Sequence, residues 1–309
     1  NITLKGFVFL FSLIILLGLF LYGGIDSLKY VIANPLTPEE FGMLRANSGV
    51  QGWISSFYSY SITALGRFVG FLFLGVAIYK KRRLETIVAY AYLILIFIGL
   101  MANLSKSSAV VFLFQIVVFH SILYNKAINF SKALLFLLLS IVLFAAIYLF
   151  TTTAEDIPTA LSLFSHRIFG EPNRVLAQYT EYYPNIYPHT YGLNIRLVHS
   201  LIGTGEFISS DALLAGNIIG ATVNTIFIGD AWVDFGYWGV MYQSLFLGAY
   251  LAILDYIVFN KKNLYTKAMC ATLILGILSL SSIALLACLI GFGLLSIPIF
   301  SVLFKIKFR

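Results

Sequence analysis

The segment TTAEDIPTALSLFSHRIFGEPNRVLAQYTEYYP (residues 152–184) opens a polar stretch that closes with NTIFIGDAWVDF (residues 224–235), and hydrophobic segments lie on both sides of it. The stretch contains eight of the thirteen acidic residues, three of the four histidines and no lysine. Its only Lys or Arg residues are Arg167, Arg174 and Arg196. Residues 152–235 are therefore predicted to form one large loop between membrane-spanning helices, and we call them the polar loop.

The composition of the whole chain is that of an integral membrane protein. Of its 309 residues, 60% are hydrophobic and 11% are charged, whereas soluble proteins average roughly 45–50% apolar and about 25% charged residues. The net charge is +7, but Lys and Arg stand at the ends of apolar segments, so we expect no nucleic-acid partner. Cys270 and Cys288 both lie in apolar runs and predict neither a disulfide nor a zinc site.

The beginning of the chain bears on its completeness. The sequence starts at Asn1 and not at Met, and its first residues do not resemble a cleavable signal peptide. We therefore expect the sequence to be part of a longer protein.

Hydrophobic length predicts the fold class, because a helix of roughly 20 apolar residues crosses the bilayer core. Eight spans are expected, near residues 6–24, 57–79, 86–104, 108–125, 133–151, 237–259, 268–284 and 287–304. Alternatively, residues 268–304 form one long helix and a re-entrant segment in place of the last two spans. The chain is thus predicted to be an all-α polytopic membrane protein, with transmembrane helices over residues 1–151, an extracytoplasmic loop over 152–235 and transmembrane helices over 236–309.

The distribution of Lys and Arg predicts the orientation, because cytoplasmic loops carry an excess of both. If the spans alternate, thirteen of the twenty basic residues fall on one side: Lys5, Lys80, Lys81, Arg82, Arg83, Lys126, Lys132, Lys261, Lys262, Lys267, Lys305, Lys307 and Arg309. We expect this side, with both ends of the chain, to be cytoplasmic. The polar loop then lies outside the cytoplasm, together with a short interfacial helix in residues 25–56 that has Thr37 as its N-cap.

Two basic residues depart from this pattern. Arg67 lies inside a predicted span, thirteen residues before Lys80 and so about 20 Å from the cytoplasmic end. It either faces the bundle interior or extends to the outer interface. Lys106, in NLSKSS (residues 103–108), is either an interfacial anchor or a ligand for an anion, because backbone N–H groups at a helix start add to its charge.

A helical pattern over residues 156–183 carries candidate anion ligands, although a glycine and a proline inside it could divide it into two shorter helices. Arg167, Glu171 and Arg174 follow at spacings that place them on one helical face. One interpretation is a surface ladder of salt bridges. The other is a diphosphate site, because guanidinium groups bind phosphate oxygens bidentately and keep their charge.

Aromatic residues and histidines follow this helix. Tyrosines at a membrane boundary often form an aromatic belt, but they also suit a sugar platform, whose rings stack on C–H surfaces; the candidates are Tyr179, Tyr183 and Tyr187. His189 comes next. Arg196 and His199 are three residues apart and hence neighbours on a helical turn, which suits a diphosphate ligand beside a base.

Motifs for metal or nucleotide chemistry are absent from the sequence, which contains no H-E-x-x-H, no G-x-x-x-x-G-K-[ST] and no G-x-S-x-G. Asp230 and Asp234 have a spacing that could hold a divalent cation, but carboxylates at a helix start also stabilise the helix. No third acid lies close in the sequence. We therefore predict neither a metal nor a cofactor.

Four segments carry a family resemblance: NLSKSSAVVFLF (residues 103–114), SHRIFGEPNRVLAQYTEYYP (165–184), HTYGLN (189–194) and NTIFIGDAWVDFGYWGVMYQSLFLGAYLAILD (224–255). Together they resemble the Wzy-type O-antigen or oligosaccharide repeat-unit polymerases of bacterial surface polysaccharide pathways. The resemblance covers roughly residues 85–260, and its sharpest part is the acidic and aromatic GDAWVDFGYWG entry into a membrane helix.

The resemblance implies a fold related to the membrane-embedded C-type glycosyltransferases (GT-C) and a place in the bacterial inner membrane, in lipopolysaccharide or related synthesis. It implies that the growing glycan leaves undecaprenyl diphosphate and joins the sugar of an incoming undecaprenyl-diphosphate-linked repeat unit at the periplasmic face. The lipid-linked oligosaccharide and the bilayer are the implied partners, with a chain-length regulator protein as a further one.

The resemblance and the residue pattern together suggest roles. Cations are expected to stabilise charge on the leaving diphosphate; they are Arg167, Arg174 and Arg196, helped by Lys106 and Arg67. His189 or His199 would take a proton from the acceptor hydroxyl, because histidine has an ordinary pKa of about 6.5. Asp211 and Asp230 are the alternative bases. Tyr179, Tyr183 and Tyr187 are the expected sugar ligands, and the reaction is expected to be independent of metal.

Other functions compete with polymerisation. A glycan ligase would use the same donor but pass the glycan to a lipid A core or a protein. A transporter of lipid-linked sugars would need charged residues through its helices and often has helices broken at the midplane. A non-enzymatic membrane scaffold is the remaining alternative.

Overall fold

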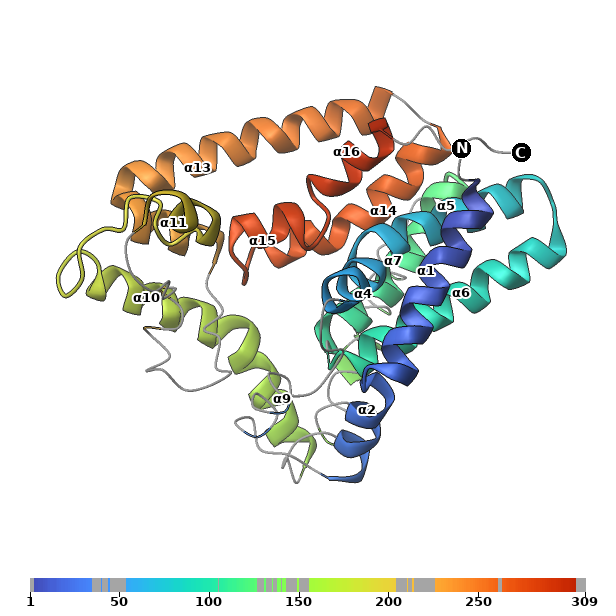
Figure 1. The fold of residues 1–309 in the computed structure, drawn as a ribbon, viewed down its shortest axis with the longest axis horizontal. Helices are drawn as coiled ribbons and strands as arrows, with labels where there is room; N and C mark the ends of the chain where they lie inside the picture. Colours follow the sequence, from blue (N-terminus) through green and yellow to red (C-terminus); the bar gives the residue numbers. More distant parts are fainter. Residues whose placement is uncertain are drawn as a thin grey trace.

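The computed structural model describes most of the chain. The residues outside the description are 1–2, 35–39, 41–43, 45–53, 105, 127–130, 132–134, 136–137, 140, 143–148, 150–155, 204–209, 211–212, 214–225, 261–262 and 304–309. The expected span 133–151 falls largely among them, and so does Thr37. In the described part all regular elements are helical (Figure 1), which confirms an all-α protein.

The helices follow one another along the chain, and η1 is a π-helical turn between two of them. Their bounds are α1 (Leu4–Leu21), α2 (Gly24–Ala33), α4 (Ile54–Thr63), α5 (Leu65–Tyr79), α6 (Arg83–Ala102), α7 (Lys106–Leu123), α9 (Ile157–Ser165), η1 (His166–Gly170), α10 (Glu171–Tyr182), α11 (Arg196–Ile202), α13 (Phe227–Asn260), α14 (Leu264–Ser279), α15 (Leu285–Ile290) and α16 (Ser296–Leu303).

Several helices are suited to a bilayer. By length and hydropathy α1, α6 and residues Phe227–Val258 of α13 are candidate spans, and α4 with α5 makes a fourth if this pair, bent by 42°, counts as one. The apolar helices α7 and α14 are shorter. The last expected span is divided into α15 and α16. The chain is thus a membrane protein with three or four candidate spans in its described part, against the eight expected.

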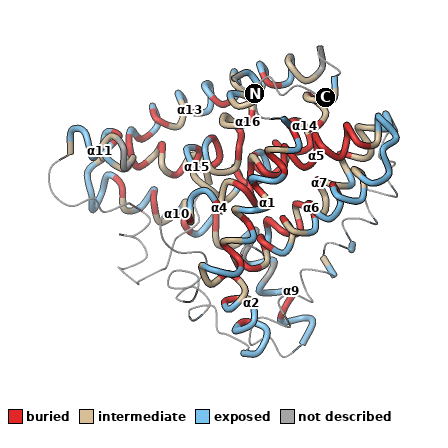
Figure 2. The backbone as a smooth tube through the Cα atoms, turned by 45° about the vertical axis from the view of Figure 1, so that its right-hand side comes forward, coloured by how far each residue is buried: buried red, intermediate tan, exposed pale blue. Residues whose placement is uncertain are grey.

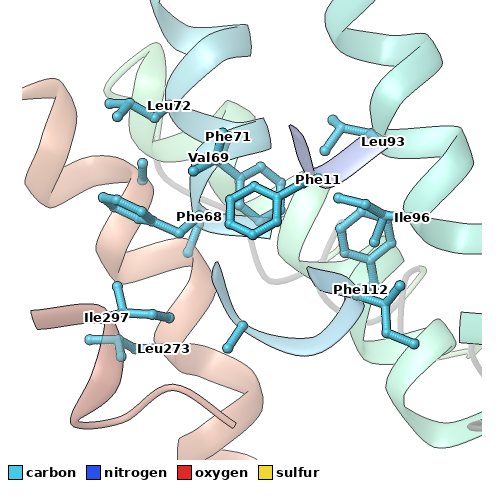
Figure 3. Close-up of a cluster of buried hydrophobic side chains, with 14 of the residues drawn as sticks. Phe11, Phe68, Val69, Phe71, Leu72, Leu93, Ile96, Phe112, Leu273 and Ile297 are labelled. Atoms are coloured by element: carbon cyan, nitrogen blue, oxygen red, sulfur yellow. The ribbon is translucent and has the colours of Figure 1, made fainter. Parts of the chain in front are cut away.

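The core of the bundle surrounds α5. This helix is buried along nearly its whole length and packs against α1, α4, α6 and α14, and Figure 2 shows the buried residues concentrated on these central helices. Aromatic and aliphatic side chains from several helices meet there, among them Phe68, Phe71 and Phe112 (Figure 3). Gly70 allows α6 to approach closely, because an added Cβ would lie 2.8 Å from Leu93.

Contacts between helix ends gather cations at one end of the bundle. Lys5 and Arg82 both pair with Glu85, at 2.8 and 2.9 Å, which links the starts of α1 and α6. Lys267 at the start of α14 donates to Leu123 O at the end of α7. The last turns of α5 touch the start of α14 and the end of α7. These ends therefore lie together, as alternating spans require.

Helix α13 reverses direction at Gly236. This residue has φ 58° and ψ −138°, which are not helical values. Gln243 Nε2 donates to Phe227 O at 3.0 Å although the two residues are 16 apart in sequence, and a straight helix would separate them by about 24 Å. Residues 227–235 (the short arm) and residues 237–260 (the long arm) are therefore antiparallel.

The long arm has the dimensions of a membrane span. Residues 237–258 extend about 33 Å as a helix, and large side chains are exposed along it, including Leu245 and Ile253. Trp238 and Tyr256, both exposed, are about 27 Å apart along the axis, close to the bilayer core of about 30 Å. Their spacing matches an aromatic residue at each interface.

Two broken helices meet inside the bundle. The break between α4 and α5 lies at Ala64, and the break between α15 and α16 contains Gly293, whose φ is +88°. The Thr63 hydroxyl shares its proton between Ser59 O at 2.6 Å and Gly291 O at 3.1 Å. A Cβ on Gly293 would lie 3.1 Å from the Cβ of Ala64. Because backbone polar groups at membrane depth must be paired within the protein, each break needs side-chain partners.

Arg67 supplies such a partner at the first break. It lies near the middle of the α4–α5 pair and is fully buried. Its Nε donates to Ile62 O at 2.7 Å, Nη1 to Gln115 Oε1 at 2.8 Å and Nη2 to Ser108 O at 3.3 Å, while its guanidinium lies 5.0 Å from the Phe112 ring centroid. Arg67 thus faces the bundle interior, and the interpretation of an arginine at the outer interface is wrong.

We expect Arg67→Met to lower the thermal stability of the purified protein in lipid nanodiscs. The substitution leaves three buried acceptors without their donor, and an unsatisfied buried group costs about 1–3 kcal/mol. The matched control is Arg174→Met, because Arg174 belongs to an exposed ion pair worth about 0–1 kcal/mol. Equal unfolding temperatures for the two variants would show that Arg67 does not stabilise the helix break.

Candidate functional site

The polar loop has a small core of its own, which forms where α10 packs against the short arm of α13. Figure 1 shows α10 and this end of α13 at the left. Its buried members are Val175, Tyr179, Tyr183 and Val233. Trp232 closes the cluster and donates from Nε1 to Tyr183 O at 2.9 Å. The helical region that leads to this core is continuous from α9 through η1 to α10, with Glu171 N bonded to His166 O. This confirms the helical pattern predicted over residues 156–183.

Asp234 attaches the segment after His189 to the short arm. Its Oδ1 accepts hydrogen bonds from Thr190 Oγ1 and, at 3.0 Å, from Gly192 N. The backbone adds Thr190 N to Val233 O at 3.1 Å and Tyr191 N to Asp234 O at 3.0 Å. Asp234 is only 6% exposed, so its carboxylate acts as a buried anchor for this segment.

Asp230 bonds to the same segment, one turn earlier on the short arm. Asn194 Nδ2 donates to Asp230 Oδ1 at 3.3 Å, and Asn194 Oδ1 accepts from Ser210 N at 2.9 Å. Among the described residues no group of three or more His, Cys, Asp and Glu side chains is placed to hold a metal ion. Both aspartates of the short arm thus have protein partners that fix the 190–194 segment.

His189 is held in one orientation by this attachment. Its Nδ1 lies 3.2 Å from Val233 O, and because a carbonyl oxygen only accepts, Nδ1 carries the proton. In the neutral imidazole Nε2 is then the acceptor. Nε2 points at Gly236, where an added Cβ would lie 3.1 Å away. The half-buried ring thus presents a proton acceptor at the turn between the two arms of α13.

Aromatic side chains surround this turn. Trp232 meets His189 edge to face at a centroid distance of 6.3 Å. Tyr237 meets Trp232 at 4.8 Å with the planes at 83°. Tyr191 and Phe235 form another edge pair at 6.1 Å. The acceptor nitrogen of His189 therefore lies in an aromatic environment made by both arms of α13.

The expected tyrosine platform has a different arrangement. Tyr179 and Tyr183 are buried in the core of the loop, so their rings cannot stack on a sugar in this structure, whereas Tyr187 is 38% exposed. The Tyr183 hydroxyl has no hydrogen-bond partner in the described part of the chain. Burial raises the pKa of this hydroxyl, and Tyr187 and the Asp234 carboxylate raise it further.

The two expected arginines whose side chains are described, Arg67 and Arg174, do not share a site. Arg174 pairs with Glu171 at 2.8 Å on an exposed face, which is one pair of the salt-bridge ladder of the first interpretation. The other partner described for Glu171 is His166, whose Nδ1 lies 3.5 Å from the same carboxylate. Arg67 lies deep in the bundle. The π turn at η1 adds a residue to one helical turn, so Arg167 and Arg174 do not keep the α-helical spacing on which their alignment depended.

For three other expected ligands the structure gives the helix in which the residue lies, but their side chains are outside the description. Arg167 is in η1, Arg196 begins α11 and Lys106 begins α7. His199 follows Arg196 in α11, as the spacing predicted. Asp211 lies outside the described residues.

The structure thus attaches His189 and the segment after it to the short arm, which carries Asp230. It places Arg174 on an exposed face of α10. Sequence reasoning missed Trp232, Tyr237 and Gly236 as parts of this region, although a glycine between aromatic residues in WVDFGYW (residues 232–238) was a usable signal. No protein family, curated protein or solved structure that was compared with this chain matches it.

Gly236→Ala is expected to disturb His189. The new Cβ would force a positive φ on an L-residue, at a cost of roughly 1–2 kcal/mol, and would press on the His189 ring. We expect a lower unfolding temperature and a changed His189 signal in the NMR spectrum of protein with ¹⁵N-labelled histidine. Gly248→Ala is the matched control in the same helix, because an added Cβ there meets nothing within 4 Å. A Gly236→Ala spectrum identical to that of Gly248→Ala would contradict the assigned contact.

Proposed function

We propose that this protein is a membrane-embedded glycosyltransferase that joins undecaprenyl-diphosphate-linked oligosaccharide repeat units at the outer face of the bacterial cytoplasmic membrane. One observation carries the proposal most directly. His189 is fixed through Nδ1 to Val233 O, with Nε2 available, where the polar loop meets a membrane span. The resemblance of the loop segments to repeat-unit polymerases supports the same reaction class.

The orientation follows from the cation-bearing end of the bundle. We assign the end with Lys5, Arg82 and Lys267 to the cytoplasm, because positive residues are enriched there. The docked end of the polar loop is then extracytoplasmic, at the level where the long arm begins. A glycan attached to a lipid diphosphate would have its first sugars at this height above the bilayer.

The chemistry is a displacement at the anomeric carbon of the growing glycan. An acceptor hydroxyl loses its proton to His189 Nε2, and its oxygen forms a bond to that carbon. The bond from the carbon to the diphosphate oxygen breaks, and undecaprenyl diphosphate leaves with the electron pair. General-base assistance of this kind contributes typically about 10²–10⁴-fold to the rate. His199, Asp211 and Asp230 are the alternative bases.

The leaving diphosphate needs positive charge. We assign Arg167, Arg196 and Lys106 to it, because preorganised cations stabilise charge that develops in the transition state. Arg174 would have to exchange Glu171 for the diphosphate, which weakens its candidacy. Arg67 is not assigned to the diphosphate, because its donors serve protein acceptors inside the bundle.

A polymerisation assay tests this function: lipid-linked repeat unit is supplied to the purified protein in nanodiscs, and the products are separated by length. A ladder of products indicates a polymerase. His189→Gln is expected to lower the polymerisation rate about 10²–10⁴-fold. His120→Gln is the control, because His120 is hydrogen-bonded to Tyr90 on α6, away from the polar loop. Full-length polymer from His189→Gln would exclude His189 as the base, and full-length polymer from Arg196→Ala would exclude Arg196 as a diphosphate ligand.

The same assay addresses the ligase alternative. A glycan ligase uses the same donor on the same side of the membrane, so the two enzymes need similar sites. With repeat-unit lipid as the only acceptor a ligase makes no ladder. Formation of product only after addition of a lipid A core or a protein acceptor would therefore replace polymerase by ligase.

Transport of a lipid-linked sugar is a second candidate, favoured by the crossing of two broken helices beside Arg67, since discontinuous helices often form midplane sites in transporters. Against it, Arg67 and Thr63 bond to protein atoms at this crossing. Translocation of a fluorescent polyprenyl-diphosphate sugar across vesicles that contain the protein, without formation of polymer, would favour transport.

A further inference from the structure

We propose that Trp232, Tyr237 and His189 form a subsite for one neutral pyranose ring of the acceptor glycan. The proposal rests on the proposed function, because it assigns a substrate class to the same outer region. It differs from the tyrosine platform expected from the sequence, since its aromatic rings belong to the two arms of α13 and not to the helix that ends at Tyr182.

The two aromatic rings form a corner around the Gly236 turn. Trp232 lies on the short arm and Tyr237 on the long arm, with their centroids 4.8 Å apart and their planes at 83°. The indole is held by its hydrogen bond to Tyr183 O, whereas Tyr237 is 80% exposed. One ring is therefore positioned by the loop core and the other is open to a ligand. A sugar ring fits such a corner by placing a C–H face on one aromatic ring.

His189 adds a polar partner to this corner. Its ring lies edge to face with Trp232, and its Nε2 faces the Gly236 turn between the two aromatic residues. A pyranose has C–H groups on its faces and hydroxyl groups around its rim. If one face of the pyranose stacks on the aromatic corner, a hydroxyl on its rim would point toward His189 Nε2 at the Gly236 turn. Removal of a proton from the hydroxyl of the acceptor sugar requires this geometry.

The carboxylates of the short arm favour an uncharged sugar over a sugar acid. The charged side chains described on the short arm are Asp230 and Asp234, and both bond to the segment that follows His189. A sugar acid would bring a third negative charge close to these two carboxylates, and like charges in a partly buried site repel. Neutral hexoses and N-acetylated hexosamines carry no such penalty.

An aromatic belt is the competing explanation for exposed Tyr237. Trp238 and Tyr242 on the next turns of the long arm illustrate it: they stack on each other at 6.2 Å, and Trp238 is 65% exposed. Tyr237 differs from these two residues in its perpendicular contact with Trp232. Trp238 is therefore a matched control, an exposed aromatic residue on the same helix at the same depth.

Binding of methyl glycosides tests the subsite without any transfer reaction. The probes are the methyl glycosides of glucose, galactose, mannose and N-acetylglucosamine, with methyl glucuronide as the charged comparison, and the readout is saturation-transfer NMR on the full chain in nanodiscs. At least one neutral probe should bind saturably and more tightly than the glucuronide. Tyr237→Ala should weaken its binding about three- to tenfold, the range of an aromatic contact, while Tyr237→Phe and Trp238→Ala should bind as the unchanged protein does.

Three results would overturn the subsite: no saturable binding of any neutral probe, equal or tighter binding of the glucuronide, or equal weakening by Trp238→Ala and Tyr237→Ala. The polymerisation assay separates this inference from the proposed function. Saturable, Tyr237-dependent binding without any product ladder would reject the polymerase alone. A ladder whose acceptor KM is unchanged in Tyr237→Ala would reject the subsite alone.

Discussion

The need to pair every backbone polar group inside the bilayer is the constraint on which the rest of the structure depends. Two helices of the bundle are interrupted, and side chains supply the missing donors at both interruptions: Arg67 to Ile62 O, Thr63 to Gly291 O and Tyr250 to Leu294 O. Gln115, which receives a hydrogen bond from Arg67, donates in turn to Thr272 O on α14. The breaks therefore fix the relative positions of α5, α7, α14 and the α15–α16 pair, against which the arms of α13 are placed.

The sequence predicted the features that depend on local pattern. Hydrophobic length indicated an all-α membrane protein, and the periodicity over residues 156–183 predicted the helical region that the structure has. The sequence placed the border between the polar loop and the next span at residues 235–237, but it could not predict the reversal at Gly236, because the turn depends on contacts between residues far apart, such as Gln243 with Phe227. Helix breaks are equally hard to predict, because length does not show that the apolar stretch 287–304 is divided into α15 and α16.

The site was predicted only in part. The sequence identified His189 as a candidate base, and the structure holds its ring in an orientation that leaves Nε2 available. The tyrosines were harder, because spacing does not show which face docks on another element: Tyr179 and Tyr183 became the core of the loop, while Trp232 and Tyr237 line the turn. The alignment of the arginines assumed ideal α-helical turns, and the π turn at His166–Gly170 removed that assumption.

The hairpin of α13 also has a mechanical consequence. Trp238 and Tyr256 stand near the two ends of the candidate span in the long arm, and His189 contacts Gly236, two residues before Trp238. A helix adapts to a thinner or thicker bilayer by tilting. If the long arm crosses a bilayer, its tilting would carry the Gly236 turn with it, and the position of His189 relative to the hydrocarbon would then depend on lipid chain length as well as on the protein.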